Sequence, residues 1–592
     1  QLFGRDLPRL VQALGLPVRT ALLKGRSSYL CTHRMELARQ DATLPDRTAV
    51  RTLAKVEEWA RITRTGDLAE LPGLDERSPV IPLITSTRDN CLGSTCPQFR
   101  ACHVNQARRE ALAADVVVIN HHLFFADLAV RESGMAELLP TVRVAIFDEA
   151  HQLNETGVQF LGAQLSTGQV IDFARDMLGA GMQLARGLAD WQQLASATER
   201  AGRDLRLAVG RTAPGARVRW TDAAPEQAEP IAWGQALQAL QQACNDAMAA
   251  LDTVSEMAPD FVRLHERAAG LAQRAGQFAG PCAPGSVRWA DAGTQLRLVE
   301  SPLDIASAVR SKILREDAPP AADEPRRSWI FTSATLGDDA RLRWFTEPCG
   351  LTEAEVLQVE SPFDYATQAA VYVPRELPKP NDPAHSAQVA QLAGDAVQRL
   401  GGATMVLTTT LRALRAIGEA LQARFDALGE VEVLVQGQWP KRRLIERFRE
   451  GAGQGRAGCV LVASASFWEG VDVPGDALQL VIIDKLPFPP PNDPLVEART
   501  RRLESEGRSP FNDYFVPEAA VALKQGAGRL IRRESDQGVL VVCDTRLATM
   551  GYGRRLLAAL PPMRRLASGA EFDEVLDGLA ATRTSTTDSG WS

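Results

Sequence analysis

Short apolar runs rich in β-branched residues alternate with helical patterns in two separated stretches of this chain. This alternation is typical of a parallel sheet with crossover helices, so each stretch predicts one α/β lobe. In open α/β sheets ligands bind at the carboxyl ends of the strands. The strands that we predict are 116–119, 142–147 and 329–332 in the first lobe and 405–407, 431–435, 459–463, 480–483 and 539–542 in the second.

Two insertions interrupt the first lobe. Residues 31–103 hold four of the nine cysteines, and residues 153–295 are rich in Ala, Gln and Leu and contain no convincing strand. Apolar residues at steps of three and four predict one face of a long helix in the second insertion, namely Leu237, Leu240, Cys244, Met248 and Leu251. The first lobe is therefore predicted at 1–30, 104–152 and 296–372, with the two insertions at 31–103 and 153–295. The second lobe is predicted at 373–581, and a disordered tail at 582–592. The run 374–383 is rich in proline and is predicted to be the hinge between the lobes.

Charge and cysteine content restrict the class of protein. No apolar run reaches the roughly eighteen residues that cross a bilayer, so no membrane partner is expected. The net charge of -7 argues against a protein coated in basic surface. It does not exclude nucleic acid, because enzymes that thread a strand gather Lys and Arg in grooves, and basic clusters occur near 441–449, 499–502 and 529–533. Nine cysteines suit a reducing cytosol, so we predict a cytoplasmic protein with free or metal-bound thiols.

The segment from Val144 to His151 is an apolar strand that ends directly in two carboxylates and a histidine, and it reads as a DEAH box. A carboxylate at the end of a strand can hold Mg²⁺ through its oxygens, and the next one can orient and deprotonate the water that attacks a γ-phosphate. We assign Asp148 to the metal and Glu149 to the water, with His151 beside the nucleotide. A four-residue motif can also occur without this function, and the alternative is that the two acids are simply solvated residues at the end of a strand.

Three further motifs follow the DEAH box, and their order and spacing match helicase superfamily 2. They are Thr332 to Thr335, Phe467 to Gly475 and Gln525 to Arg532. Planar guanidinium groups hold two phosphate oxygens at once and stabilise the charge that builds up as the bond breaks. We predict that Gln525, Arg529 and Arg532 act in catalysis from one helix of the second lobe. The predicted nucleotide-contacting residues are His151, Ser333, Thr335, Glu469, Gly470 and Asp472.

Four cysteines of the first insertion form a candidate metal site: Cys31, Cys91, Cys96 and Cys102. Four thiolates can hold either zinc or a [4Fe-4S] cluster, and the spacing does not decide between them, although the C-x2-C pairs of zinc ribbons are absent. Unliganded buried thiols fit poorly because residues 91–102 form a polar loop. The sequence therefore predicts a metal-ligand role.

Together, these motifs make the chain resemble the iron-sulfur helicases of the XPD and bacterial DinG type along almost its whole length. The resemblance also includes residues 23–31, 63–67, 120–123, 361–364 and 485–488, and it is strongest to the shorter bacterial branch that includes YoaA. It implies two RecA-like lobes, a [4Fe-4S] cluster on the four cysteines and an Arch domain at 153–295, which together form a pore over the first lobe.

The resemblance further implies the activity. The expected protein is an ATP-dependent 5′-to-3′ DNA helicase that uses Mg²⁺ and ATP. It is expected to act on single-stranded and forked DNA in repair or replication-fork processing. It is expected to work as a monomer, with a replication or repair protein as a possible partner. Base-stacking roles for Trp59, Phe99 and Trp468 compete with the commoner fate of core packing.

No Gly-Lys-Ser or Gly-Lys-Thr occurs in the 592 residues, so the loop that wraps the β- and γ-phosphates is missing. We expect an N-terminally truncated helicase, because Asp148, Glu149, Arg529 and Arg532 would have little reason to persist together without ATP. The alternative is a non-hydrolysing iron-sulfur protein that binds DNA or a repair partner.

Overall fold

The computed structural model describes residues 2–588 except 41–46, 77, 133–138, 140–141, 214, 222, 315–326, 427–428, 430, 453–457, 465–466, 468–472, 474 and 476. The chain divides into two compact units. The first contains Gln1–Thr332, Pro348–Gly350 and Asn492–Arg499, and the second contains Ser333–Glu347, Leu351–Pro491 and Thr500–Ser592. None of the described helices is both long enough and apolar enough to cross a membrane.

Two pairs of parallel strands carry the motifs of the first unit. β1 (Thr20–Leu22) pairs with β2 (Val116–Val118), and β3 (Val144–Asp148) pairs with β9 (Ser328–Thr332). In the second pair Asp148 lies opposite Thr332, so the acid-bearing strand and the strand that leads into the Ser/Thr motif end at the same level. The three strands predicted here are confirmed to within two residues.

The cysteine-bearing insertion folds around its own small core. Its helices are α2 (Thr32–Gln40), α3 (Arg47–Ala60) and α4 (Ile81–Ile84), and Leu53, Val56 and Trp59 of α3 lie in that core. The next helix, α5 (His103–Leu112), packs instead against β1. Gly66 has φ +67°, and its carbonyl accepts a hydrogen bond from the Leu30 amide at 2.8 Å. A Cβ at Gly66 would lie 2.3 Å from the His103 ring, so only glycine allows this close approach.

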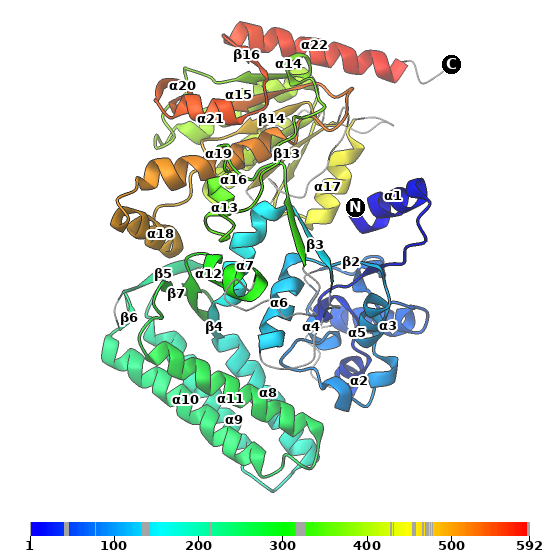
Figure 1. Cartoon of the computed structure of the whole chain (residues 1–592), viewed down its shortest axis with the longest axis vertical. Helices are drawn as coiled ribbons and strands as arrows, with labels where there is room; N and C mark the ends of the chain where they lie inside the picture. Colours follow the sequence, from blue (N-terminus) through cyan, green and yellow to red (C-terminus); the bar gives the residue numbers. More distant parts are fainter. Residues whose placement is uncertain are drawn as a thin grey trace. The chain divides into compact units, whose positions relative to one another are not determined.

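The second insertion places four long helices side by side (Figure 1). They are α8 (Thr167–Leu184), α9 (Trp191–Ala208), α10 (Pro230–Asp252) and α11 (Pro259–Ala279). The predicted apolar face of α10 is confirmed, since Leu237, Leu240, Cys244 and Leu251 are buried and Met248 packs beside them. Glu229 begins this helix by accepting hydrogen bonds from the amides of Ile231 and Ala232, just before Pro230 at the first helical position.

The expectation that the second insertion contains no strand is wrong. An antiparallel sheet with strand order β4-β8-β7-β5-β6 accompanies the helices. Its strands are β4 (Ala163–Ser166), β5 (Ala216–Thr221), β6 (Ala224–Pro225), β7 (Ser286–Ala292) and β8 (Leu296–Pro302). β5 and β7 carry arginine and aspartate that pair across the sheet, so their apolar signal is weak in sequence although Val218 and Ala290 are buried.

The second unit is built on one parallel sheet with strand order β12-β13-β11-β14-β15-β10-β16. Its strands are β10 (Ala369–Tyr372), β11 (Thr404–Thr408), β12 (Val431–Val435), β13 (Gly458–Ser464), β14 (Leu480–Ile483), β15 (Gly538–Val542) and β16 (Arg564–Leu566). The five predicted strands are confirmed, while β10 and β16 were not predicted. The α/β class with two lobes therefore agrees with the structure.

Both faces of this sheet are covered, which explains why its central strands are continuously apolar. Met405 and Leu407 of β11 face a core shared with α17 (Lys441–Glu450) and α19 (Val516–Ala527), whereas Val406 faces the core on the other side. That other core is shared with α15 (His385–Leu400), α16 (Leu411–Phe425) and α22 (Gly569–Asp588).

Three predicted boundaries differ from the structure. The second insertion extends beyond 295, because β8 pairs with β4 and β7 of its sheet. The run 374–383 lies inside the second unit rather than between the units, because β10 before it already pairs with β15 and β16. The tail predicted to be disordered from 582 is helical as far as Asp588, because α22 is anchored by buried Phe572, Leu576 and Leu579 and continues outward from them. Residues 589–592 lie outside the described part of the chain.

Candidate nucleotide and cluster sites

The two acids of the DEAH box are exposed at the carboxyl end of β3. Glu149 has φ +50°, in the left-handed region that a residue with a Cβ seldom adopts. This turn ends the strand, and it costs about 1–3 kcal/mol for a residue other than glycine. His151 Nδ1 lies 3.3 Å from Glu149 Oε2, and the histidine side chain is buried while the glutamate is mostly exposed. The carboxylate is thus held from one side and open on the other.

A second histidine stands beside the same strand end. His121 begins α6 (His121–Glu132), its ring lies 5.8 Å from that of Phe147, and the backbone of Asp148 hydrogen bonds to it. Burial lowers the pKa of His121 more than this hydrogen bond raises it, so the ring is neutral near pH 7. A neutral ring adds no positive charge next to the proposed metal ligand.

In the second unit the structure brings three predicted residues together. The Thr335 amide donates to Ser333 Oγ at 3.2 Å, and the amide of Gln525 on α19 reaches Thr335 Oγ1 at 3.5 Å. Thr335 is 4% exposed, so its hydroxyl is fixed in place by these neighbours. The Ser/Thr motif and the arginine motif, 190 residues apart in the chain, are therefore connected by side chains.

The prediction that Arg529 and Arg532 lie on the same helix as Gln525 is wrong. α19 ends at Ala527, and Arg529 and Arg532 follow in a turn. The buried carboxylate of Asp536 accepts hydrogen bonds from the amide of Arg532 at 2.8 Å and from the amide of Arg533 at 2.9 Å. These two hydrogen bonds fix the backbone conformation of the turn.

The buried side chain of Gln368 supports the same turn. Its amide donates to the carbonyls of Arg533, Glu534 and Asp536 at 2.9–3.1 Å. Sequence analysis missed both Asp536 and Gln368, because neither belongs to a motif. An aspartate four residues after an arginine was the only signal present.

The remaining predicted nucleotide contacts are not described together. Asp148 and Glu149 belong to the first unit and Arg529 and Arg532 to the second, so their convergence on one triphosphate stays a prediction. Glu469, Gly470 and Asp472, like Trp468, lie outside the described residues. Of the other aromatics, Trp59 packs in the core of the cysteine-bearing insertion, and Phe99 is 37% exposed.

Four thiols of the first unit influence one another electrostatically. Burial raises the pKa of the Cys31 thiol, and the neighbouring Cys91, Cys96 and Cys102 raise it further, against a hydrogen bond from the Arg34 backbone. All four are free and partly exposed. Among the described residues, no group of three or more His, Cys, Asp or Glu side chains has the geometry of a metal site.

Two buried carboxylates that sequence analysis missed stand at the carboxyl ends of β14 and β15. Asp484 accepts hydrogen bonds from the amides of Thr409 at 2.9 Å and Lys485 at 2.8 Å. Asp544 accepts one from the Leu486 amide at 2.9 Å and pairs with Arg546 at 2.7 Å. Asp484 directly follows β14, and Asp544 follows β15 after the buried Cys543, so an acid at the end of an apolar run was a signal that could have identified both.

Burial raises the pKa of Asp484 from 3.8 to about 6. Because the folded value is the higher one, the stability associated with this group is fully present below about pH 4 and is lost as pH rises to about 6. Asp484→Asn keeps a carbonyl oxygen for both amides and carries no charge. We expect its free energy of unfolding to exceed that of the wild type by about 2–3 kcal/mol above pH 6, and the two to converge near pH 4.

Urea unfolding of both proteins between pH 4 and pH 8 measures this difference. The substitution Asp573→Asn, at an exposed acid paired with Arg399, is the control and should show no comparable pH-dependent gain. A constant difference between wild type and Asp484→Asn across the range would contradict the prediction.

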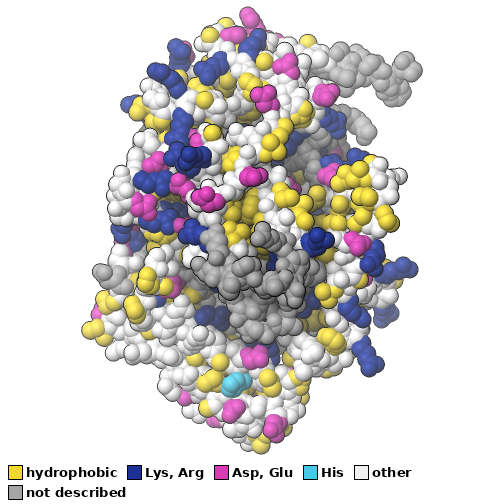
Figure 2. All heavy atoms as spheres, viewed as in Figure 1, with side chains coloured by type: hydrophobic (Ala, Val, Ile, Leu, Met, Phe, Trp, Pro, Cys, Tyr) yellow, Lys and Arg dark blue, Asp and Glu magenta, His cyan; other side chains and the backbone are white. Residues whose placement is uncertain are grey.

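A cavity of about 660 Å³ lies between the cysteine-bearing insertion and the helices of the second insertion. Arg34, Arg175, Arg267 and Arg274 line it from both sides. Arg267 pairs with Asp176 at 2.7 Å, so the positive charge is partly balanced. On the face drawn in Figure 2, the visible Lys and Arg side chains are interspersed with Asp and Glu and form no continuous basic surface.

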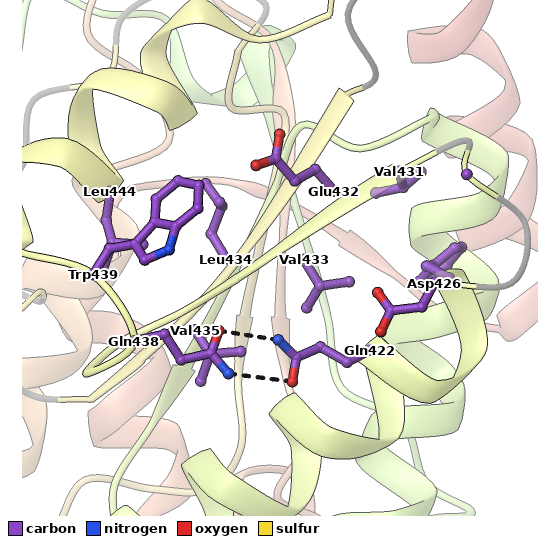
Figure 3. Close-up of a pocket in the computed structure, with 12 residues that line it drawn as sticks. Gln422, Asp426, Val431, Glu432, Val433, Leu434, Val435, Gln438, Trp439 and Leu444 are labelled. Carbon is purple, nitrogen blue, oxygen red and sulfur yellow. Dashed lines mark hydrogen bonds between the residues drawn. The ribbon is translucent and has the colours of Figure 1, made fainter.

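A second cavity, of about 420 Å³, lies along β12 at the outer edge of the sheet of the second unit. Figure 3 shows the amides of Gln422 and Gln438 joined by two hydrogen bonds beside this strand, at 3.0 and 3.3 Å. None of the predicted site residues lines this cavity.

Comparisons with known proteins identify relatives along nearly the whole chain. Residues 394–563 match the family model described as helicase C-terminal domain. The chain is 38% identical to the ATP-dependent DNA helicase YoaA of Escherichia coli, over 95% of this chain and 85% of that protein. It is 32% identical to the ATP-dependent helicase DinG of Mycobacterium tuberculosis, over 98% and 86%. A solved XPD helicase structure matches with a TM-score of 0.53 at 12% identity, over 94% and 89%, a likeness of fold.

Proposed function

Because this chain belongs to the XPD-type superfamily 2 helicases of the YoaA and DinG branch, we propose that it is an ATP-dependent DNA helicase that moves 5′ to 3′ and opens forked duplexes in repair or replication-fork processing. The observation that carries this proposal is the acid pair at the end of β3, level with the end of β9. The proposed protein is a cytoplasmic monomer that binds single-stranded and forked DNA.

The proposed chemistry assigns one task to each acid. Asp148 would hold Mg²⁺, which would supply positive charge against the phosphate oxygens, and Glu149 orients and deprotonates the attacking water. The positive φ of Glu149 supports this division, because it turns the second carboxylate away from the line of the strand. His151 restrains that carboxylate through the 3.3 Å contact.

The second unit supplies the residues that respond to the γ-phosphate. In the proposed mechanism Arg529 and Arg532 stabilise the charge on the transferring phosphoryl group, while Gln525 relays the state of the nucleotide to Thr335 and Ser333. The 3.5 Å contact between Gln525 and Thr335 supports the relay. The hold of Asp536 on the arginine turn supports a preorganised site.

The proposed activity is tested on a fusion of the 592-residue chain with an N-terminal P-loop segment, because the 592 residues contain no Gly-Lys-Ser or Gly-Lys-Thr to grip the phosphates. We expect ATP hydrolysis that depends on single-stranded DNA, and opening of a duplex with a 5′ tail but not of one with a 3′ tail. If the fusion bound DNA but showed no DNA-dependent ATP hydrolysis, the result would instead support a non-hydrolysing iron-sulfur protein that binds DNA.

We further propose that Cys31, Cys91, Cys96 and Cys102 hold a [4Fe-4S] cluster. The donor type fits, since thiolates are the usual ligands of iron-sulfur clusters. The four thiols are also close in space, because Cys91, Cys96 and Cys102 each raise the pKa of the Cys31 thiol. When bound, the cluster would tie the 91–102 loop to the start of α2, and it takes no part in hydrolysis.

Replacing one of these thiols should remove the cluster. We expect anaerobically purified Cys91→Ser protein to lose iron and acid-labile sulfide together. The control Cys282→Ser, at an exposed cysteine of the second insertion, should retain both. Iron, sulfide and zinc analysis makes the comparison, and stoichiometric zinc without sulfide in the wild type would overturn the cluster assignment.

The cavity lined by Arg34, Arg175, Arg267 and Arg274 is the proposed passage for the DNA strand. Guanidinium groups from two insertions face one space, which suits a phosphate backbone. Balancing acids such as Asp176 fit a strand that must slide rather than bind tightly.

A further inference from the structure

A short segment of the chain, Asn492–Arg499, belongs to the first unit although the chain on both sides of it belongs to the second. We call this segment the strap. It contains Pro494, where α18 (Pro494–Ser505) begins, and its acids Asp493 and Glu497 are four residues apart. Asp493 directly precedes the helix, and Glu497 lies in its first turn.

The strap is joined to β5 of the second insertion by two ion pairs. Arg219 Nε lies 3.0 Å from Glu497 Oε2, and Arg217 pairs with Asp493. The two arginines alternate along β5 and so project from the same side of the strand. Arg217 is also held by Asp291 at 3.2 Å and lies over the Trp289 ring, with its guanidinium carbon 5.0 Å from the ring centroid.

A third contact anchors the end of the strap. Arg499 is 7% exposed, its Nε donates to the Leu303 carbonyl at 2.8 Å, and its Nη1 lies 2.7 Å from Glu155 Oε1. Leu303 directly follows β8, and Glu155 lies in α7 (Leu153–Leu161), at the start of the insertion. The strap therefore contacts the insertion at its sheet and at the points where the chain enters and leaves it.

The strap is connected to the second unit by a short, stiff linker. Between the end of β14 and the strap run residues 484–491, which include Pro487, Pro489, Pro490 and Pro491. Proline-rich segments are extended and semi-rigid, so they transmit a displacement instead of absorbing it. The start of this linker is fixed to the sheet edge by the buried carboxylates of Asp484 and Asp544.

We propose that the strap is a mechanical coupling between the motor and the helical insertion. During ATP turnover, movement of the carboxyl ends of β14 and β15 passes through the proline linker to the strap. From the strap it passes through the ion pairs of Asp493 and Glu497 to Arg217 and Arg219. These arginines belong to the insertion that flanks the proposed DNA passage. These four are positioning residues for strand separation and do not touch the nucleotide. This inference rests on the proposed helicase function.

The charge pairs permit a reciprocal exchange as a test. In the P-loop fusion we expect Arg219→Glu and Glu497→Arg each to keep ATP hydrolysis within about twofold of the unsubstituted fusion, while the number of base pairs opened per ATP falls about fivefold. The double variant Arg219→Glu/Glu497→Arg restores the pair with its polarity reversed, and should recover most of this ratio.

The matched control is Arg203→Glu, at an arginine of the same insertion whose partner Glu199 is in the same helix. It should leave the ratio unchanged. Equal ratios for Arg219→Glu and Arg203→Glu, or a double variant no better than the single variants, would overturn the proposed coupling.

Hydrogen exchange on the 592-residue chain separates failure of this inference from failure of the proposed helicase function. We expect faster exchange in residues 493–499 for Arg219→Glu and recovery in the double variant. A wild type without DNA-dependent hydrolysis would reject the helicase function alone, whereas unchanged exchange in Arg219→Glu would reject the strap.

Discussion

Replacing Glu149 by glutamine should lower DNA-stimulated ATP hydrolysis by about 10²–10⁴-fold, the usual loss when a general base is removed. Glutamine keeps the size of the side chain and its contact with His151, but it cannot take a proton from water. Nucleotide binding should survive, because Mg²⁺ is assigned to the neighbouring Asp148. Phosphate release and fluorescent-nucleotide binding, both measured on the P-loop fusion, separate the two effects.

The control for this substitution is Glu199→Gln, which removes an acid of the first unit that pairs with Arg203 in the same helix. Its hydrolysis rate should equal that of the wild type. If Glu149→Gln retained more than about a tenth of wild-type turnover, Glu149 would not be the base, and the division of labour between the two acids would be wrong.

The largest expected effect on stability is that of Arg288→Met, which should destabilise the helical insertion by about 3–5 kcal/mol. Arg288 is 4% exposed and pairs with the buried Glu300 at 2.5 Å. It also donates to carbonyls at and just beyond the end of α11, reaching Gln277 at 2.8 Å and Gly280 at 2.6 Å. Methionine removes all of these donors and leaves the carboxylate buried without its cation.

Denaturant-dependent hydrogen exchange in α10 and α11 measures this loss locally, which matters because a chain with two compact units need not unfold in one step. Arg288→Met/Glu300→Met removes both charges and should recover much of the stability, since apolar replacement of a whole buried pair is often tolerated. A loss below about 1 kcal/mol for Arg288→Met would show that the pair contributes little to the fold.

Sequence reasoning located the strands of the second sheet well for a physical reason. β11, β13, β14 and β15 are buried on both faces, so the residues at their centres are apolar and the signal is a continuous run of apolar residues. The strands of the second insertion were missed because Arg217, Arg219 and Asp291 interrupt the apolar pattern. The two arginines are paired with acids distant in the chain, Asp291, Asp493 and Glu497.

The sequence by itself determined which chemistry stands at the ends of strands: Asp148 and Glu149 after β3, Ser333 and Thr335 after β9, and four thiols in one insertion. These signals are local, because a motif is a run of neighbours in the chain. The tertiary structure alone decided their supports, such as Asp536 beneath the arginine turn, Arg288 at the end of α11 and the strap on β5. Hydrogen bonds and ion pairs between distant segments impose no periodicity on the sequence, so only the folded chain reveals them.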